Sequence, residues 1–257
     1  MSPARLHGVG VVVTRPHAAA EALAAPLAAE GATVWLLPAL AIEDLAPTEA
    51  LARVLGSLAR FDMAIFVSAN AVEKGIAAAR RLAPWPQGIR IAAIGEATAQ
   101  ALRSAGLGPV ISPAERHDSE ALLALAPLQV VKGQNIVVFR GEGGREHLKE
   151  ALEARGARVE YAECYRRVRP DSDPSAVVAA LARGEVNAVS ALSAETLENF
   201  IEMIGPAAAQ QLGGVTLVVP HAAVGTHREA RRFARVAVAG HGPQGLIEAL
   251  TQLRVTT

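Results

Sequence analysis

Blocks of this sequence recur later in the chain at one constant offset. Arg15 and Arg140 end two matching blocks and lie 125 residues apart (140 − 15), and Ser68 and Ser193 show the same separation (193 − 68). Strand–helix units resemble one another in many α/β proteins, but chance likeness would not keep one offset across several blocks. The sequence therefore predicts an internal duplication. The matched blocks are Val11–Arg15 with Ile136–Arg140, Gly31–Val34 with Gly156–Val159, Phe61–Glu73 with Val186–Glu198, and Ile91–Ala99 with Thr216–Val224.

Within both copies, short apolar runs alternate with longer stretches rich in Ala and Leu. The short runs favour buried strands and the longer stretches favour amphipathic helices. Their alternation predicts an α/β fold with mainly parallel sheets and helices on both faces. The expected strands are Gly10–Thr14, Thr33–Leu37, Met63–Val67, Ile91–Ile94, Pro109–Ile111, Asn135–Phe139, Arg158–Ala162, Ala188–Ala191, Val215–Val219 and Ala234–Ala239. The expected helices include Ala19–Glu30, Ala71–Arg81, Ala97–Ala105, Arg145–Arg155, Ala194–Ile204 and His227–Phe233.

Composition argues against several classes of protein. The 257 residues carry 25 basic and 25 acidic side chains, so no global positive field is available to attract nucleic acid. The single cysteine, Cys164, rules out a disulfide within the chain, and the seven scattered histidines do not suggest a metal site. No apolar run reaches about 18 residues, so we expect no membrane span. The N-terminal residues show no signal-peptide pattern, and the cytoplasm is the expected compartment.

Polar residues in the turns that follow strands are the candidate site residues, because ligands of open parallel sheets bind beyond the carboxyl ends of the strands. The turn Arg140–Arg145 holds Gly141, Gly143 and Gly144 between two arginines. Glycines allow close approach of the backbone to a ligand, a following helix presents free N–H groups, and arginine adds forked donors. These features favour an anion site, although a glycine-rich turn with solvated arginines explains them too. The pattern is neither a Walker A loop nor a Rossmann fingerprint.

Ser68 and Ser193 each precede an expected helix. A serine at that position caps the helix by accepting a hydrogen bond from a free N–H, and the same helix start, with Ala69 and Asn70, can also bind an anion. Neither serine lies in a Gly-x-Ser-x-Gly elbow or beside a paired histidine, so neither is expected to be a nucleophile.

Three other residues have more than one interpretation. Thr98 is either a cap or first-turn hydroxyl, or a ligand contact. Tyr165 either packs with its hydroxyl in water or donates a hydrogen bond to substrate. Cys164 is expected to be buried as a small hydrophobic residue.

The order and spacing of these motifs resemble the uroporphyrinogen-III synthase family, over nearly the whole chain. The motifs are Thr14–Pro16, Phe66–Val72, Ile94–Ala99, Arg140–Glu146 and Cys164–Arg167. The resemblance implies two flavodoxin-like domains with parallel sheets, related by the duplication and joined by a two-stranded linker, with the substrate held between them. It implies a discontinuous first domain of residues 1–37 and 171–257, a second domain of residues 41–164, and linkers at 38–40 and 165–170.

The resemblance also implies a reaction. The linear tetrapyrrole hydroxymethylbilane becomes cyclic uroporphyrinogen III, with loss of water and inversion of ring D, and without a metal or organic cofactor. Tyr165 is implied as the weak acid that helps the substrate hydroxyl leave. The turn Pro220–Ala223 departs from the Gly-x-x-Thr turn common in the family, and His221 is expected to substitute there. A monomer without nucleic-acid or membrane partners is expected. The implied substrate-binding residues are Thr14, Arg15, Ser68, Ala69, Asn70, Thr98, Arg140, Gly141, Gly143, Gly144, Arg145, Ser193 and His221.

Two other functions remain open at this point. A non-catalytic, two-lobed binding or sensor protein for an anionic small molecule shares the same plan. A sugar-phosphate or nucleotide enzyme would require a catalytic His, Lys or acidic pair, and none is well placed in the sequence.

Overall fold

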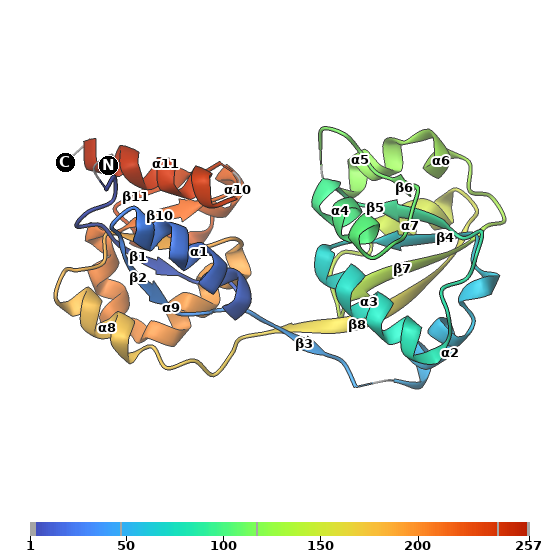
Figure 1. The fold of residues 1–257 in the computed structure, drawn as a ribbon, viewed down its shortest axis with the longest axis horizontal. Helices are drawn as coiled ribbons and strands as arrows, with labels where there is room; N and C mark the ends of the chain where they lie inside the picture. The colour runs from blue at the N-terminus through green and yellow to red at the C-terminus, as the bar shows by residue number, and fades with distance from the viewer. Residues whose placement is uncertain (1–3, 47, 117, 241, 256–257) are drawn as a thin grey trace. The chain divides into compact units, whose positions relative to one another are not determined.

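The structure is a computed structural model that describes residues 4–46, 48–116, 118–240 and 242–255. The chain divides into two compact units, each built around its own sheet (Figure 1). Unit 1 comprises Met1–Ala41 and Val168–Thr257, and unit 2 comprises Ile42–Arg167.

Unit 1 contains a five-stranded sheet in the order β11-β10-β9-β1-β2, and its strand pairs are parallel. Alternate side chains of each strand point to opposite faces, so Val12 and Leu217 pack under one layer of helices and Val11 and Val218 under the other. The strands are β1 (Gly10–Val13), β2 (Thr33–Leu36), β9 (Ala188–Ser190), β10 (Thr216–Val219) and β11 (Arg235–Val238). The helices are α1 (His17–Ala29), α8 (Ser175–Ala182), α9 (Ala194–Ala209), α10 (Ala222–Gly225) and α11 (Gly242–Val255), with 3-10 turns η2 (Gln210–Gly214) and η3 (Arg228–Arg232).

Unit 2 contains a six-stranded sheet in the order β3-β8-β7-β4-β5-β6. The pairs from β8 to β6 are parallel. Its strands are β3 (Ala41–Asp44), β4 (Met63–Phe66), β5 (Arg90–Ala93), β6 (Val110–Ile111), β7 (Asn135–Gly141) and β8 (Arg158–Val168). Its helices are α2 (Glu49–Gly56), α3 (Ala69–Leu82), α4 (Glu96–Ser104), α5 (Ser119–Ala124), α6 (Ala126–Gln129) and α7 (His147–Ala154), with the 3-10 turn η1 (Leu58–Arg60).

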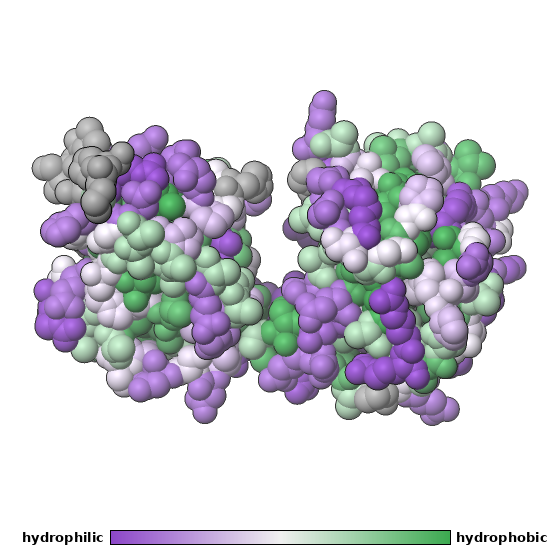
Figure 2. Space-filling model, viewed as in Figure 1, coloured by the Kyte–Doolittle hydropathy of each residue, from purple (hydrophilic) through white to green (hydrophobic). Residues whose placement is uncertain are grey.

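Two separate apolar layers cover the sheet of unit 2. Helices α2, α3 and α4 bury one face, where Phe66 of β4 stacks on Phe139 of β7 with ring centroids 4.4 Å apart. Helices α5, α6 and α7 bury the other face, which includes Ile65 and Val138. The visible outer surface of each unit mixes hydrophilic and hydrophobic residues (Figure 2). The predicted α/β fold with parallel sheets is therefore confirmed.

The structure departs from the predicted elements in a few places. Strand β3 was not expected, because Ala41–Asp44 has no apolar run and becomes a strand only beside β8. The expected helix Arg145–Arg155 begins later, at His147, so the glycine-rich loop is longer than predicted. The expected helix at His227–Phe233 is a 3-10 turn over Arg228–Arg232.

Candidate active site

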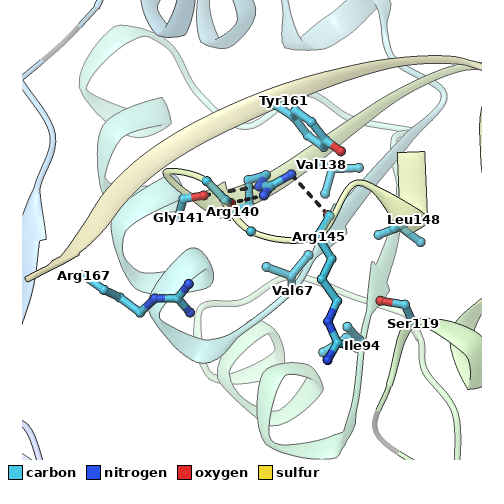
Figure 3. A pocket seen from close by; sticks show the side chains of 12 residues that line it. Val67, Ile94, Ser119, Val138, Arg140, Gly141, Arg145, Leu148, Tyr161 and Arg167 are labelled. Atoms are coloured by element: carbon cyan, nitrogen blue, oxygen red, sulfur yellow. Dashed lines mark hydrogen bonds between the residues drawn. The ribbon is translucent and has the colours of Figure 1, made fainter. Parts of the chain in front are cut away.

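Unit 2 has a cavity of about 280 Å³ at the carboxyl ends of its strands (Figure 3). Val67 follows β4, Ile94 follows β5, and the glycine-rich loop follows β7, so neighbouring parallel strands deliver their turns to one place. Arg145 extends from the loop toward Ile94 in Figure 3, which places an exposed guanidinium beside an apolar wall. A cavity of this composition suits a ligand with apolar rings and anionic substituents. The full lining is Val67, Ile94, Ser119, Val138, Arg140, Gly141, Gly143, Gly144, Arg145, Leu148, Tyr161 and Arg167.

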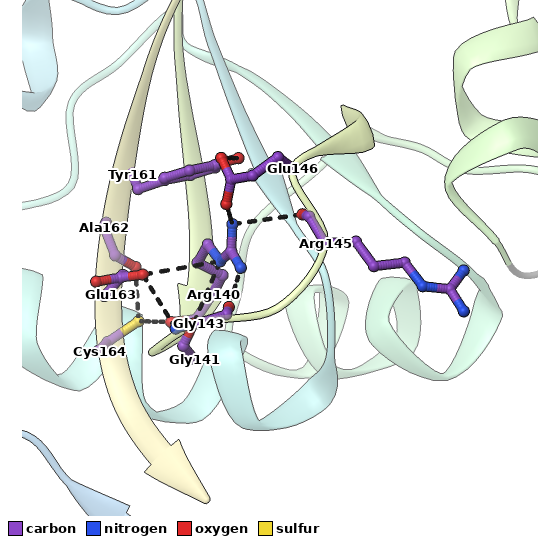
Figure 4. Close-up of polar contacts among 9 residues, drawn as sticks. All are labelled: Arg140, Gly141, Gly143, Arg145, Glu146, Tyr161, Ala162, Glu163 and Cys164. Atoms are coloured by element: carbon purple, nitrogen blue, oxygen red, sulfur yellow. Dashed lines mark hydrogen bonds and ion pairs between the residues drawn. The ribbon is translucent and has the colours of Figure 1, made fainter. Parts of the chain in front are cut away.

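Arg140 holds the glycine-rich loop closed (Figure 4). Its side chain is 6% exposed, its Nε donates to the carbonyl of Gly141 at 3.2 Å, and another nitrogen donates to the carbonyl of Gly143. A third nitrogen donates to Glu146 Oε1 at 3.1 Å, and the guanidinium lies 4.3 Å from the ring centre of Tyr161. Most of its five donors are thus used inside unit 2, so Arg140 holds the loop in one conformation, and we call this set of contacts the brace.

Glu146 and Tyr161 complete this brace. Tyr161 Oη donates to Glu146 Oε2 at 2.8 Å. This bond, followed by Arg140, lowers the pKa of Glu146, while burial and then the Glu146 carboxylate raise the pKa of Tyr161. Because the two pKa values are displaced in opposite directions, the carboxylate stays ionised and the phenol stays protonated near neutral pH. The pair is thus suited to fixing the loop rather than to transferring a proton.

The loop itself depends on glycine at two positions. Gly143 has φ +69° and Gly144 has φ +99°, conformations that other residues rarely adopt. The Gly143 N–H donates to Glu163 Oε1 at 3.3 Å, so this group is already used inside the unit. Arg145 is exposed at the end of the loop, and its carbonyl rather than its guanidinium meets Arg140.

Tyr165 lies on the opposite face of the sheet from Tyr161. The pairing of β7 with β8 is irregular after Arg140, since Arg140 pairs with Glu163 but Gly141 pairs with Tyr165. This β-bulge skips one residue and turns Tyr165 into the layer that contains Cys164 and helix α3. There Tyr165 is 4% exposed, and its hydroxyl lies 3.0 Å from Ser68 Oγ.

Ser68 and Ser193 are helix caps, as predicted. Ser68 Oγ accepts a hydrogen bond from the Ala71 N–H at 3.0 Å at the start of α3, where Ala69 and Asn70 are the first residues. Ser193 Oγ accepts one from the Thr196 N–H at 3.1 Å at the start of α9. Both helices therefore open with their positive ends at the carboxyl edge of a sheet.

The remaining predicted residues also follow strands, at the carboxyl ends of the sheets, but they differ in their exposure to solvent. Thr98, in the first turn of α4, is 4% exposed. Thr14 is fully buried and its hydroxyl donates to the carbonyl of Ser190 at 2.7 Å. His221 is exposed at the start of α10.

Arg15 follows β1 of unit 1 and is half-buried. Burial lowers the pKa of its guanidinium from the ordinary value. Among the described residues, its buried Nε has no hydrogen-bond partner. A buried donor without a partner is costly, so the position is suited to receiving an anion.

The structure brings Ser68 together with Tyr165, and it gathers Arg140, the glycines and Arg145 around one cavity. Sequence reasoning missed Tyr161, Glu146 and the apolar wall of Val67 and Ile94. The alternation of side chains along β8 could have indicated Tyr161, because residues two apart in a strand share a face. Tyr161 and Glu163 do lie on the face that meets Arg140. The prediction for Cys164 is confirmed: it is buried, and burial raises the pKa of its thiol to about 12.

Within the described ranges, no group of three or more His, Cys, Asp or Glu side chains is arranged to hold a metal ion. No helix in the described part of the chain is both long and apolar enough to cross a bilayer.

Comparisons with known proteins agree with this architecture. A family model described as Uroporphyrinogen-III synthase HemD matches residues 21–248. Uroporphyrinogen-III synthase of Escherichia coli (strain K12) is 32% identical over 197 residues, which cover 76% of this chain and 80% of that protein. The same enzyme from Salmonella typhimurium (strain LT2) is 38% identical over 160 residues, which cover 62% of this chain and 65% of the relative.

Solved structures show the same fold. A crystal structure of a mutant uroporphyrinogen III synthase from the extremely thermophilic bacterium Thermus thermophilus covers 97% of this chain and 100% of its own, with a TM-score of 0.67 at 22% identity. The enzyme from Helicobacter pylori 26695 covers 96% of this chain and 99% of its own, with a TM-score of 0.58 at 14% identity.

Parallel-sheet α/β units with polar turns at the carboxyl ends of the strands define the class of protein, an α/β protein that binds its ligand at that edge of the sheet. The chain belongs to the uroporphyrinogen-III synthase family. The resemblance seen in the sequence is thereby confirmed, together with the assignment to a lyase of tetrapyrrole biosynthesis. The alternative of a non-catalytic binding protein is not favoured.

Proposed function

We propose that this chain cyclises hydroxymethylbilane to uroporphyrinogen III with loss of water and inversion of ring D. Family membership supplies the reaction, and the hydrogen bond between Tyr165 and Ser68 is the observation that connects it to this structure. A buried tyrosine hydroxyl, held at the start of a helix, is suited to donating a proton to a leaving hydroxyl.

The proposed chemistry makes modest demands on the protein. The pyrrole nitrogen of ring A pushes electrons toward the hydroxymethyl carbon, the C–O bond breaks, and Tyr165 protonates the departing oxygen, which leaves as water. Ring D then attacks the hydroxymethyl carbon through its substituted carbon, which forms a spiro intermediate. The original bond from that ring D carbon to the methylene group shared with ring C breaks, the freed methylene carbon bonds to the other α-carbon of ring D, and that carbon loses its proton. The folding of the bound chain decides which carbon attacks, so positioning of the substrate determines the isomer. No metal or organic cofactor is part of the proposal.

The substrate carries eight carboxylates, and the proposed contacts divide by their surroundings. Direct anion contacts are assigned to Arg15, whose buried Nε has no hydrogen-bond partner among the described residues, and to the exposed side chains of Arg145 and His221. The helix start at Ala69 and Asn70 is assigned the same task. Residues that are buried, hydrogen-bonded within their own unit, or part of the glycine-rich loop conformation are assigned the task of shaping the site. The second group comprises Thr14, Ser68, Thr98, Arg140, Gly141, Gly143, Gly144 and Ser193.

We further propose that each unit is a flavodoxin-like domain and that the two arose by duplication with exchange of elements. Strand starts support this: β1 and β7 begin 125 residues apart (135 − 10), as do β2 and β8 (158 − 33) and β4 and β9 (188 − 63). In the sheets, β1 pairs with β9 and β7 pairs with β4, so each sheet combines strands from both halves of the sequence.

The proposed division of the chain remains residues 1–37 with 171–257, residues 41–164, and a two-stranded linker at 38–40 and 165–170. Strands β3 and β8 are neighbours, and each contains a point where the chain passes from one unit to the other. This pairing supports a two-stranded linker. A monomeric, cytoplasmic enzyme without nucleic-acid or membrane partners completes the proposal.

One experiment tests the function. Purified protein is incubated with hydroxymethylbilane, the products are oxidised, and the type I and type III porphyrin isomers are separated. We expect type III with the protein and type I without it. Type I alone in the presence of folded protein overturns the proposal. In the same assay, Tyr165→Phe is expected to lower kcat without unfolding the protein, and an unchanged kcat removes Tyr165 from the mechanism.

A further inference from the structure

Ser68 has a second contact that helix capping does not require. Its Oγ accepts from the Ala71 N–H and also lies 3.0 Å from Tyr165 Oη. Ser193 caps α9 in the same way, but its other partner is Thr196 Oγ1 at 2.9 Å. Thr48 caps α2 by accepting from the Leu51 N–H at 3.1 Å. A phenol beside the cap is thus a special feature of Ser68 among these three residues.

The Ser68–Tyr165 hydrogen bond can run in either direction, and the inference uses the direction in which Ser68 donates. The Ser68 oxygen already accepts from Ala71, and its single proton is then available to Tyr165 Oη. When Ser68 donates, the Tyr165 proton is directed to a different acceptor. The chain of hydrogen bonds begins at the positive end of α3, a 14-residue helix, and successive bonds polarise one another.

The rest of Tyr165 is already immobilised. Its carbonyl accepts from the Glu142 N–H at 2.7 Å, and its ring lies against the backbone of Gly141. The side chain is 4% exposed. Rotation of the hydroxyl is therefore the remaining freedom, and Ser68 is the group that controls it.

We infer that Ser68 is a positioning residue that directs the Tyr165 proton toward the leaving hydroxyl of the substrate. The inference rests on the proposed function. As the C–O bond breaks, the proton passes from Tyr165 to the departing oxygen and completes a water molecule. The negative charge left on Tyr165 Oη is held by the Ser68 hydroxyl. The cyclised tetrapyrrole later releases one ring proton as its last pyrrole regains aromaticity, which restores Tyr165.

A double-mutant cycle tests this inference. Ser68→Ala, Tyr165→Phe and the double variant are compared for kcat, for KM with hydroxymethylbilane and for thermal stability. Each single variant should lose at least about 10-fold in kcat with little change in KM, because the proton is used only in the transition state. The double variant should be no slower than Tyr165→Phe, since Ser68 acts through Tyr165. Ser68→Thr, which keeps the hydroxyl, should recover most of the kcat lost in Ser68→Ala.

Thr48→Ala is the matched control, because it removes a cap from another helix of the same unit at an exposed residue that does not line the cavity. It should lower the melting temperature and leave kcat unchanged. Two outcomes overturn the inference and leave the proposed function standing. One is that the effects of Ser68→Ala and Tyr165→Phe on kcat multiply in the double variant, and the other is a normal kcat in Ser68→Ala. A wild-type protein that yields only the type I isomer overturns the proposed function and the inference with it.

Discussion

The backbone of Gly141 lies against the aromatic ring of Tyr165. A Cβ atom on Gly141 would come within 2.7 Å of Cε2 and 2.8 Å of Cζ of that ring, which is closer than such atoms can approach. The ring is buried and hydrogen-bonded at its hydroxyl, so it cannot easily move aside. Glycine is required here for the close approach, whereas Gly143 and Gly144 are required for their positive φ.

The contact predicts the effect of a methyl group. Gly141→Ala should displace Tyr165 from Ser68 and lower kcat by about 10- to 100-fold, because small displacements of a positioned group are costly in catalysis. Steady-state kinetics measures the change. Gly56→Ala is the control, since a Cβ there meets nothing within 4 Å, and its kcat should match the wild type. Normal activity in Gly141→Ala would show that the ring position is unimportant.

Arg140 is predicted to contribute to stability through its forked donors. Arg140→Lys keeps the charge but loses the geometry that joins Gly141, Gly143 and Glu146, and we expect a loss of about 2 kcal/mol in the free energy of unfolding. Urea denaturation followed by circular dichroism measures it. Arg158→Lys, at an exposed position at the start of β8, should change the value by less than about 0.5 kcal/mol. Equal stability of the two variants contradicts the role of Arg140 as a brace.

Replacing Arg15 is predicted to stabilise the fold and to weaken substrate binding. Arg15→Met removes a buried donor that has no partner among the described residues, so the free energy of unfolding should rise by about 1 kcal/mol. KM for hydroxymethylbilane should rise by about 10-fold or more with kcat nearly unchanged, as expected for a lost contact to a carboxylate. Denaturation and kinetics on the same preparation give both values. Loss of stability with an unchanged KM would assign Arg15 to the core instead of the site.

The single cysteine offers a test of burial and of alkaline stability. With a thiol pKa of about 12 in the folded protein, Cys164 should react very slowly with a disulfide reagent at pH 8, and stoichiometrically once the protein is unfolded. The unfolded thiol ionises first, near pH 9, so the unfolded state binds fewer protons above that pH. Stability should therefore fall from about pH 9 until the folded thiol also titrates near pH 12. Cys164→Ala should flatten this decline, and rapid labelling of the native protein at pH 8 would contradict the burial.

The local parts of the site were predictable because they depend on neighbours in sequence. Ser68 and Ser193 cap their helices through groups three residues away, and such bonds are a property of the peptide segment. The glycine-rich turn Arg140–Arg145 and the apolar runs of most strands could be predicted from the sequence in the same way. Strand β3 was not, because a short segment with two carboxylates becomes a strand only through its neighbour β8.

Sequence alone determined the α/β class, the alternation of strand and helix, the capping serines and the family, since all of these follow from local periodicity and motif order. Tertiary structure decided which side chains meet. The bulge between β7 and β8 moves Tyr165 to the face of Ser68, and it leaves Tyr161 on the face of Arg140 and Glu146. One residue skipped in a strand reverses the face of every side chain after it, and the register that creates the skip is set by pairing between distant segments.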